Sequence, residues 1–356
     1  MTCMCKCALG QRDMLQDVRS KDLDITRSSP LDGTFRAKMH HHSQLEQARV
    51  VSLFSGCGGM DLGFSGGFRF LNKWYSPLPF NIIWANDINE FACKTYKHNL
   101  GKEIICGDIW DVIETLPNAA DVVIGGFPCQ DISVNGKRAG IYGTRSGLYK
   151  AMVDVVKRLS PKIFVAENVR GLLMKNNRES LDKVLSDFKD IGYQVTYKLY
   201  NAADFGVPQT RDRVFIVGTK HGIDFIHPKA VYGEQDYVTA KQALEDLEEV
   251  PESESINHIW SKANRSPDQG SRSLKADRPG YTIRAECHGN IQFHYKKTRR
   301  ISMREAARIQ SFPDDFIFQA KLRETERQVG NAVPPVLAWY IGGAVIKALN
   351  QADEYC

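Results

Sequence analysis

The sequence predicts an α/β fold with a mostly parallel, doubly wound sheet, and three observations support this prediction. Short apolar runs rich in β-branched residues recur along the chain, and such runs are typical of strands covered on both faces. Segments with helical periodicity fall between them. Glycines or carboxylates follow several of the runs, as they do where the strand ends of a parallel sheet form a ligand site.

Each element can be located from its own signal. The predicted strands are residues 49–54, 81–85, 103–106, 121–125, 162–166, 193–200 and 214–218. Helical patterns occupy residues 89–99 and 148–159, and Pro161 ends the second. Ser302 and Glu305 match a capping box that begins a later helix. The apolar residues 336–349 predict a final helix that packs back on the sheet domain.

The chain divides into four parts by composition. Residues 1–48 are polar with little periodicity, which predicts a disordered extension. The α/β domain is expected over residues 49–220. Residues 221–300 contain several prolines and glycines without a strong period, so they are expected to form a smaller, irregular domain. Residues 301–350 are expected to lead back to the first domain as a hinge and C-terminal helix.

Composition excludes several classes of protein. The chain of 356 residues is 42% hydrophobic and 25% charged, the balance of a soluble globular protein. No apolar run approaches the roughly 18 residues of a membrane helix, so no membrane partner is expected. The nine cysteines lack the paired spacing of a zinc site, which predicts reduced thiols in an intracellular protein and no bound metal. A net charge of +5 permits a nucleic-acid partner without requiring one.

The distribution of charge is more informative than its sum. Lysines and arginines are interleaved with aromatic residues over residues 262–300. Such a mixture suits a surface that binds phosphates. A merely solvated face explains the same stretch, and both interpretations remain open at this point.

Three successive strand ends carry the features of an adenosine pocket. A glycine-rich turn, residues 54–59, follows the first predicted strand, and glycine lets the backbone approach a ligand closely. Asp87 ends the second strand and Asp108 follows the third, where a carboxylate can bind ribose hydroxyls. These features do not distinguish S-adenosylmethionine from NAD. The lack of a phosphate-binding lysine and of a full dinucleotide fingerprint favours a cofactor without phosphates.

A reactive group is expected beside this pocket. Cys129 follows the fourth strand, although alone it is better interpreted as a buried thiol. Glu167 ends the fifth strand, and Arg211 and Arg213 precede the last, at alternate positions that share one face of a strand. A cysteine, a glutamate and two arginines at one sheet edge form a plausible reaction centre.

These motifs together resemble the DNA (cytosine-5)-methyltransferase family, chiefly its bacterial restriction-modification type. The resemblance covers about residues 49–349. The motifs follow the family's order: Phe-Ser-Gly-Cys-Gly-Gly, Gly-Asp-Ile, Gly-Phe-Pro-Cys-Gln, Glu-Asn-Val, Gln-x-Arg-x-Arg and Gln-Val-Gly-Asn-Ala-Val-Pro-Pro. The implied fold is a Rossmann-like S-adenosylmethionine-dependent methyltransferase sheet, and residues 221–300 would be the target-recognition domain.

The resemblance also implies a role for each polar residue of the reaction centre. The Cys129 thiolate would attack carbon 6 of cytosine and make carbon 5 nucleophilic. Glu167 would hold the Watson–Crick edge and protonate ring nitrogen 3. Arg213 would contact the base carbonyl, and Arg211 would support the Cys129 loop and the substrate. Because carbon 6 is inaccessible in a stacked duplex, the base would flip out.

Binding residues are implied in the same way. The cofactor S-adenosylmethionine would contact Phe54, Gly56, Asp87, Asp108, Ile109, Pro128, Leu148, Asn331 and Val333. Duplex DNA would contact Ser133, Asn135, Arg145, Thr282, Ile283 and Arg284, with Arg284 a candidate for reading guanine. Ile88 stands where many relatives have an aromatic residue, so aliphatic packing would replace stacking on adenine.

The resemblance sets expectations about the setting and leaves alternatives. The protein would act as a monomer in the bacterial cytoplasm, on nucleoid DNA, alongside a cognate restriction endonuclease. An RNA cytosine methyltransferase is one alternative, but the Cys-Phe-Thr signature of that branch does not occur in the sequence. A DNA-binding relative without catalysis is another, although every reaction-centre residue is retained. An NAD oxidoreductase explains the sheet but none of the later motifs.

Overall fold

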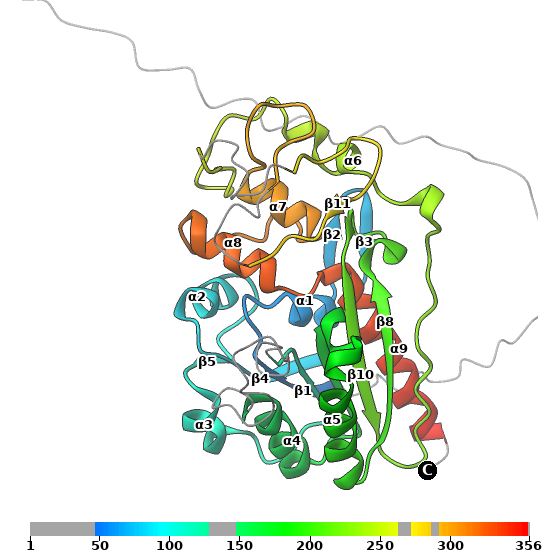
Figure 1. Cartoon of the computed structure of the whole chain (residues 1–356). Coiled ribbons are helices and arrows are strands. Elements are labelled where there is room, and N and C mark those ends of the chain that lie inside the picture. The colour runs from blue at the N-terminus through cyan, green and yellow to red at the C-terminus, as the bar shows by residue number, and fades with distance from the viewer. Residues whose placement is uncertain (1–46, 128–146, 263–271, 286–291, 355–356) are drawn as a thin grey trace, which may run out of the picture. The chain divides into compact units, whose positions relative to one another are not determined.

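A seven-stranded sheet forms the centre of the computed structural model, which describes residues 47–127, 147–262, 272–285 and 292–354 (Figure 1). The strand order is β5-β4-β1-β6-β7-β10-β8. Neighbours from β5 to β7 are parallel, whereas β10 is antiparallel to both β7 and β8. The predicted mostly parallel α/β fold is therefore confirmed. The strands of this sheet are β1 (Ala48–Leu53), β4 (Phe80–Asp87), β5 (Ile104–Cys106), β6 (Val122–Gly125), β7 (Ile163–Val169), β8 (Gln194–Asn201) and β10 (Asp212–Thr219).

Each predicted strand corresponds to one strand of this sheet. The predictions missed the strands that form two small separate pairs, which have only two or three residues each and so carry no readable alternation. These strands are β2 (Phe68–Phe70), β3 (Lys73–Tyr75), β9 (Gln209–Thr210) and β11 (Gly280–Tyr281). In the described part of residues 221–300, β11 is accompanied only by short helices.

Helices begin where the sequence supplies caps. Asn89 caps α2 by accepting a hydrogen bond from the Ala92 amide at 2.9 Å. Ser302 and Glu305 form the predicted capping box of α7. The α-helices are α1 (Gly59–Ser65), α2 (Glu90–Asn99), α3 (Ile109–Val112), α4 (Gly147–Leu159), α5 (Arg178–Asp190), α6 (Ala240–Leu244), α7 (Met303–Ile309), α8 (Leu322–Asn331) and α9 (Pro335–Glu354).

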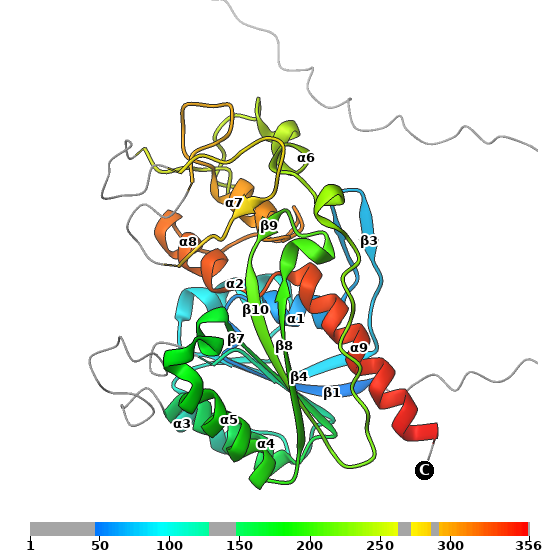
Figure 2. The same cartoon turned by 45° about the vertical axis from the view of Figure 1, so that its right-hand side comes forward.

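Alternate side chains of the strands enter two cores on opposite faces of the sheet. On β10, Val214 and Ile216 pack with residues of α4 and α5, whereas Phe215 and Val217 pack on the other face. Figure 2 shows α4 and α5 together on one side of the sheet and α9 on the other. This double cover explains why the strands read as continuous apolar runs.

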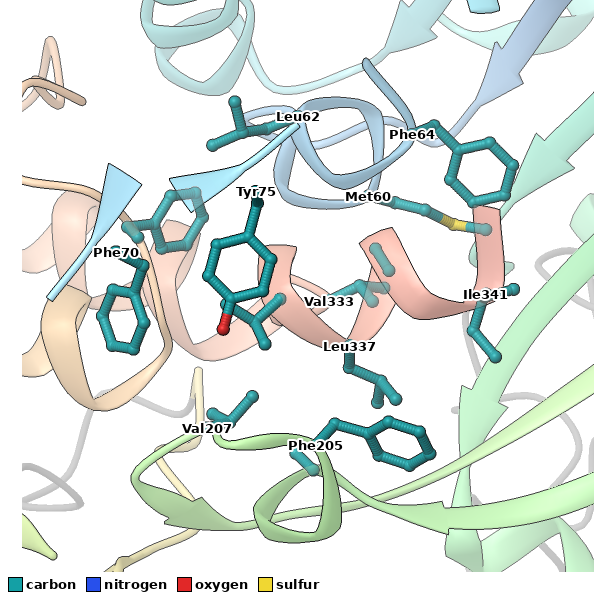
Figure 3. Close-up of a cluster of buried hydrophobic side chains, with 14 of the residues drawn as sticks. Met60, Leu62, Phe64, Phe70, Tyr75, Phe205, Val207, Val333, Leu337 and Ile341 are labelled. Atoms are coloured by element: carbon teal, nitrogen blue, oxygen red, sulfur yellow. The ribbon is translucent and has the colours of Figure 1, made fainter. Parts of the chain in front are cut away.

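The C-terminal helix α9 packs on α1 (Figure 3). A Cβ at Gly63 would lie only 2.4 Å from the Ala338 Cβ, so this approach of the two helices requires glycine. Residues 322–351 are long and apolar enough to cross a membrane by composition, but 72% of the apolar window is buried inside the protein. The packing on α1 therefore identifies α9 as a core helix of the sheet domain.

A carboxyl group is buried under the sheet edge in α1. Asp61 has no exposed surface, and the Tyr96 hydroxyl donates to its Oδ1 at 3.0 Å. Burial raises the pKa of Asp61 from its ordinary value of 3.8 to about 7, although the Ser52 and Tyr96 hydroxyls partly offset this rise. Asp61 is therefore protonated in the folded protein at pH 5 but ionised in the unfolded chain.

We expect this difference to make the stability of the protein depend on pH. Because the folded-state pKa is raised, the contribution of Asp61 is fully present below pH 3.8 and is lost as pH rises through about 7. Between pH 5 and pH 7 the free energy of unfolding should fall by about 2 kcal/mol through this group. Urea unfolding of Asp61→Asn should lack this component. Asp190→Asn, at the exposed end of α5, should keep it, and a pH dependence shared by both variants would contradict the assignment.

Candidate active site

An ion pair between Glu167 and Arg213 lies where β7 ends and β10 begins. These strands are paired with Arg213 opposite Val169, which brings the two side chains to the same sheet edge. Arg213 Nε donates to Glu167 Oε1 at 2.6 Å, and the two side chains are only 11% and 10% exposed. The predicted meeting of a glutamate and an arginine at this edge is therefore present in the structure.

The chain that leads to Cys129 passes directly beside this pair. A Cβ at Gly126 would lie 3.0 Å from Glu167 Oε2, so glycine allows the carboxylate to approach this backbone. The neighbouring Asn168 donates from Nδ2 to the Phe127 carbonyl at 3.0 Å. The ends of β6 and β7 are thus joined immediately before the segment that contains Cys129.

The pKa of Glu167 is raised, because burial disfavours its charged form. The positive charges of Arg213 and Arg211 offset this effect only in part. A carboxyl group in this state retains a proton at higher pH than an exposed glutamate does. It can accordingly act as a proton donor to a base held against it.

Arg211 is also close to Glu167, but its guanidinium is directed to the backbone. The side chain is fully buried and donates to the carbonyl oxygens of Ile283 at 2.7 Å, Gly330 at 2.6 Å and Ala332 at 3.0 Å. These contacts tie together three separate segments of the chain. Arg211 therefore holds the walls of the site together, and its predicted support of the Cys129 loop and the substrate stays a prediction.

The glycine-rich turn after β1 is hydrogen-bonded to the end of β4. Asp87 accepts hydrogen bonds from the amides of Gly56 and Asn89, both at 2.8 Å. Phe54 and Gly56 have positive φ values of 55° and 58°. A Cβ built at Gly56 meets no atom within 4 Å, so the backbone borders open space of the kind a ligand requires.

The end of β5 is hydrogen-bonded to the end of β4. The Gly107 amide donates to the Asp87 carbonyl at 3.0 Å, and Asp108 caps α3 by accepting from the Trp110 amide at 3.0 Å. Ile109 is buried in the core shared with α4, in which Leu148 is partly buried. Asp87, Asp108 and the start of α4 therefore belong to one corner of the sheet.

The Gln-Val-Gly-Asn-Ala-Val-Pro-Pro motif, residues 328–335, packs against this corner of the sheet from the other side. Val333 is buried, and its carbonyl oxygen would lie 2.5 Å from a Cβ at Gly59. Cys57 Sγ contacts the Gln328 carbonyl at 3.9 Å. Asn331, at the end of α8, is exposed. Residues distant in sequence, which were predicted to bind one cofactor, thus pack around the glycine-rich turn.

Residues 282–284 are positioned by the β9–β11 pair. The Thr282 hydroxyl donates to the Thr210 carbonyl at 2.7 Å, and the Ile283 amide donates to Gln209 Oε1 at 2.9 Å. The Ile283 side chain is fully buried in the core, and its expected contact with DNA stays a prediction. Arg284 is exposed. We assigned no role to Gln209 from its motif, yet it is the side chain that fixes Ile283.

A pocket of about 670 Å³ lies between Arg213 of the ion pair and residues 282–284. A Cβ at Gly330 would lie 2.4 Å from backbone atoms of Arg284 and Ala285, so its wall depends on that glycine. The pocket is large enough for a nucleotide and mainly polar in character. Its lining consists of Val169, Arg170, Gly171, Asn201, Thr210, Asp212, Arg213, Thr282, Ile283, Arg284, Ala285, Gly330 and Asn331.

Comparison with known proteins identifies the chain's relatives. The sequence matches the family described as C-5 cytosine-specific DNA methylase over residues 48–276 and 247–347. The chain belongs to this family. Membership confirms the resemblance drawn from the sequence motifs and the predicted activity of a DNA cytosine-5 methyltransferase.

Individual relatives match along most of their length. The type II methyltransferase M.NgoFVII of Neisseria gonorrhoeae is 37% identical over 331 residues, which cover 83% of this chain and 85% of the relative. The type II methyltransferase M.BbvI of Brevibacillus brevis is 32% identical, with coverage of 86% and 92%.

Solved structures support the fold. The S. pombe Dnmt2 methyltransferase superposes with a TM-score of 0.62 at 20% identity, covering 84% of this chain and 99% of that one. The Entamoeba histolytica methyltransferase EhMeth gives 0.64 at 16% identity, with coverage of 85% and 99%. At these identities the likeness shows the fold alone.

Some predicted residues of this methyltransferase lie outside the described part of the chain. They fall in the segment 128–146 and are Pro128, Cys129, Ser133, Asn135 and Arg145. Their roles therefore stay predictions.

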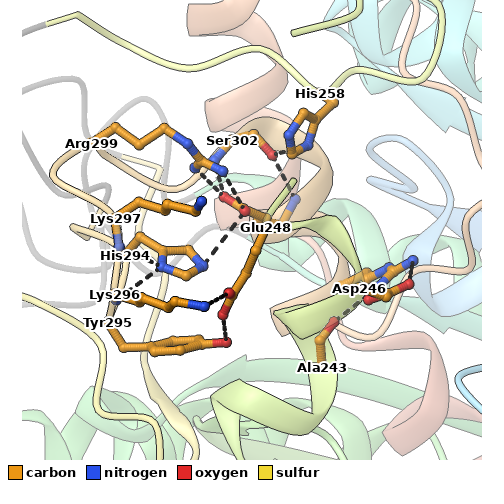
Figure 4. A network of polar contacts seen from close by, with 12 residues as sticks. Ala243, Asp246, Glu248, His258, His294, Tyr295, Lys296, Lys297, Arg299 and Ser302 are labelled. Carbon is orange, nitrogen blue, oxygen red and sulfur yellow. Dashed lines mark hydrogen bonds and ion pairs between the residues drawn. The ribbon is translucent and has the colours of Figure 1, made fainter. Parts of the chain in front are cut away.

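Several of the described cations between residues 262 and 300 are paired with carboxylates. Lys297 lies 2.7 Å from Glu249, and Lys262 lies 2.6 Å from Glu252. Lys296 and Tyr295 both contact Glu248 (Figure 4). The surplus of positive charge on these three lysines is therefore smaller than the sequence alone suggests, because each of them has an acidic partner.

Proposed function

We propose that this protein transfers a methyl group from S-adenosylmethionine to carbon 5 of cytosine within a short duplex DNA sequence. The observation that carries the proposal is the buried Glu167–Arg213 pair, which borders the polar pocket and lies beside the chain leading to Cys129. Family membership supplies the substrate class. An active-site glutamate with a raised pKa is suited to ring nitrogen 3 of cytosine.

In the proposed reaction the Cys129 thiolate forms a bond to carbon 6 of the flipped base. Protonation or hydrogen bonding of ring nitrogen 3 by Glu167 draws the displaced electron pair into the ring, so that carbon 5 becomes nucleophilic. Arg213 orients Glu167 and contacts the base carbonyl. Carbon 5 takes the methyl group as its bond to the cofactor's sulfonium would break, leaving a neutral thioether, and carbon 5 then loses its own proton to water. The bond between carbon 6 and the Cys129 sulfur breaks, which restores the thiolate, and ring nitrogen 3 returns its proton to Glu167 as the ring becomes aromatic again.

S-adenosylmethionine would supply the electrophilic methyl group. Asp87 and Asp108 would bind its polar groups, and Phe54, Gly56 and Val333 would surround it. The open space beside Gly56 is compatible with a ligand close to the backbone. The remaining contacts proposed for the cofactor come from Ile109, Pro128, Leu148 and Asn331.

Ile88 offers a test of the cofactor position, because it follows Asp87 and is 70% exposed. Ile88→Ala should weaken S-adenosylmethionine binding by about 5- to 30-fold, since lost apolar burial of about 1–2 kcal/mol corresponds to that change. Calorimetric titration measures the effect. Ile226→Ala is the matched control, because Ile226 is also 70% exposed and lies in the segment after β10. Equal affinity of the two variants would refute the proposed position of adenosine.

We further propose the setting of the reaction. Residues 49–220 would form the catalytic domain, residues 221–300 the target-recognition domain, and residues 301–350 the return to the first domain. DNA would be contacted by Ser133, Asn135, Arg145, Thr282, Ile283 and Arg284. The protein would act as a monomer on bacterial cytoplasmic DNA and protect it from a cognate restriction endonuclease.

The direct test is methyl transfer with tritiated S-adenosylmethionine. Duplex DNA should accept label as 5-methylcytosine at one sequence context, whereas RNA of the same sequence should not. A duplex carrying 5-fluorocytosine at that position should trap a covalent complex, because the fluorine cannot leave as the proton does. Transfer to RNA alone, or binding of DNA and cofactor without transfer, would refute the proposal in favour of the RNA enzyme or the inactive relative.

A further inference from the structure

The pocket beside the Glu167–Arg213 pair carries a surplus of positive charge. Three arginines line it, Arg170, Arg213 and Arg284, but Asp212 is its only lining carboxylate among the described residues. Arg213 already forms an ion pair with the buried Glu167. The remaining charges make the pocket suitable for an anion.

Arg170 and Asp212 form a second ion pair at the mouth of this pocket. Arg170 begins the short helix η3 (Arg170–Leu173) directly after β7, and Asp212 is the first residue of β10. Because Arg213 is opposite Val169, the strand register brings these two neighbours together. Arg170 NH1 donates to Asp212 Oδ2 at 2.9 Å, and this is the one hydrogen bond of the Arg170 side chain within the described ranges.

The two ion pairs of the site differ in their exposure. The side chains of Arg170 and Asp212 are 65% and 30% exposed, against about a tenth for Arg213 and Glu167. An exposed pair of this kind contributes only about 0–1 kcal/mol. A guanidinium has five N–H donors, so most of those of Arg170 are available to another acceptor. Arg170 can therefore exchange Asp212 for another acceptor at little cost in free energy.

We propose that Arg170 binds a DNA backbone phosphate next to the target nucleotide, and that Asp212 holds it in the free protein. This inference rests on the proposed function. A phosphate accepts two parallel hydrogen bonds from a guanidinium and is bound more strongly than an exposed single contact to a carboxylate. Arg170 also neutralises Asp212, whose charge would otherwise repel the phosphate. The position of both residues on the pocket wall that contains Arg213 brings this phosphate close to the base.

The test is the salt dependence of duplex binding by the full chain. Arg170→Gln should weaken binding by about 10-fold and reduce the slope of log Kd against log salt by about 1, equally for cognate and unrelated sequences. Arg170→Lys should keep the slope, since it keeps the charge. Arg178→Gln is the matched control, because Arg178 has the same 65% exposure and pairs with Asp182 on α5, away from the pocket. Asp212→Asn should bind DNA more tightly than the wild type.

The outcomes separate this inference from the function on which it rests. If Arg170→Gln and Arg178→Gln share the wild-type slope and affinity while the wild type methylates DNA, the phosphate contact is overturned and the function stands. The phosphate contact would also be overturned if Arg170→Gln lowered only kcat at saturating DNA and left the affinity for DNA unchanged. If the wild type binds no duplex DNA, the proposed function and this inference both fail.

Discussion

Glu167→Gln should reduce the rate of methyl transfer by about 100- to 10,000-fold, the range usual for loss of a positioned proton donor. Glutamine keeps the size of the side chain and one oxygen for Arg213, which lies 2.6 Å away in the wild type. It cannot give a proton to ring nitrogen 3, because an amide does not titrate in water. Single-turnover transfer to duplex DNA with saturating cofactor measures the chemical step directly.

The matched control for this substitution is Glu326→Gln. Burial also raises the pKa of Glu326, and two arginines, Arg300 and Arg323, offset part of that rise, as Arg213 and Arg211 do for Glu167. Glu326 lies on α8 and does not line the pocket. We expect its variant to transfer methyl groups at the wild-type rate. A similar loss in both variants would assign Glu167 a structural role only.

The fold was predictable wherever a strand is covered on both faces. In β7 every residue from Ile163 to Ala166 is buried, so the sequence shows an uninterrupted apolar run that no exposed loop would have. The strands β2, β3, β9 and β11 were not predictable, because two or three residues are too few for a period. The pairing of β9 with β11 also depends on contacts distant in sequence, such as Gly280 with Gln209.

The candidate site was predictable in part. Residues at or near the ends of long strands, such as Glu167 and Asp87, were located correctly because strand ends meet at one edge of a parallel sheet. Alternation predicted that Arg211 and Arg213 share one face of a strand, but the strand is interrupted at position 211, between β9 and β10. The burial of Ile283 was not predictable for a related reason: it arises from tertiary packing of a segment with no period of its own.

Charge was the least predictable property of the site. Lys296 and Lys297 read as part of a basic stretch, yet their partners Glu248 and Glu249 lie about 48 residues earlier. The pair of Arg170 with Asp212 was missed for the same reason, since it follows from the register of β7 and β10. Composition gives the number of charged residues, whereas binding depends on which of these residues already form ion pairs in the folded protein.

Arg211→Met should lower the free energy of unfolding by about 2–6 kcal/mol, because the carbonyl oxygens of Ile283 and Gly330 would lose a buried donor at about 1–3 kcal/mol each, whereas that of Ala332 keeps Gln310 Nε2. Arg304 is a close structural match, since it is also fully buried and donates to three carbonyl oxygens, those of Ile256, Pro313 and Phe316. Arg304→Met should therefore cost similar stability, as measured by urea unfolding.

The two arginine variants should differ in function, because only the carbonyls held by Arg211 flank the pocket. Ile283 and Gly330 line it, whereas Ile256 and Pro313 do not. At a temperature where circular dichroism shows both variants folded, Arg211→Met should raise the KM for DNA about 10-fold or more, since a small displacement of binding groups is costly. Arg304→Met should match the wild type. If Arg211→Met does not fold, Arg211→Lys retains the charge and fewer donors, and the same comparison applies. Equal KM values for the destabilised, folded variants would mean that Arg211 stabilises the protein without shaping the pocket.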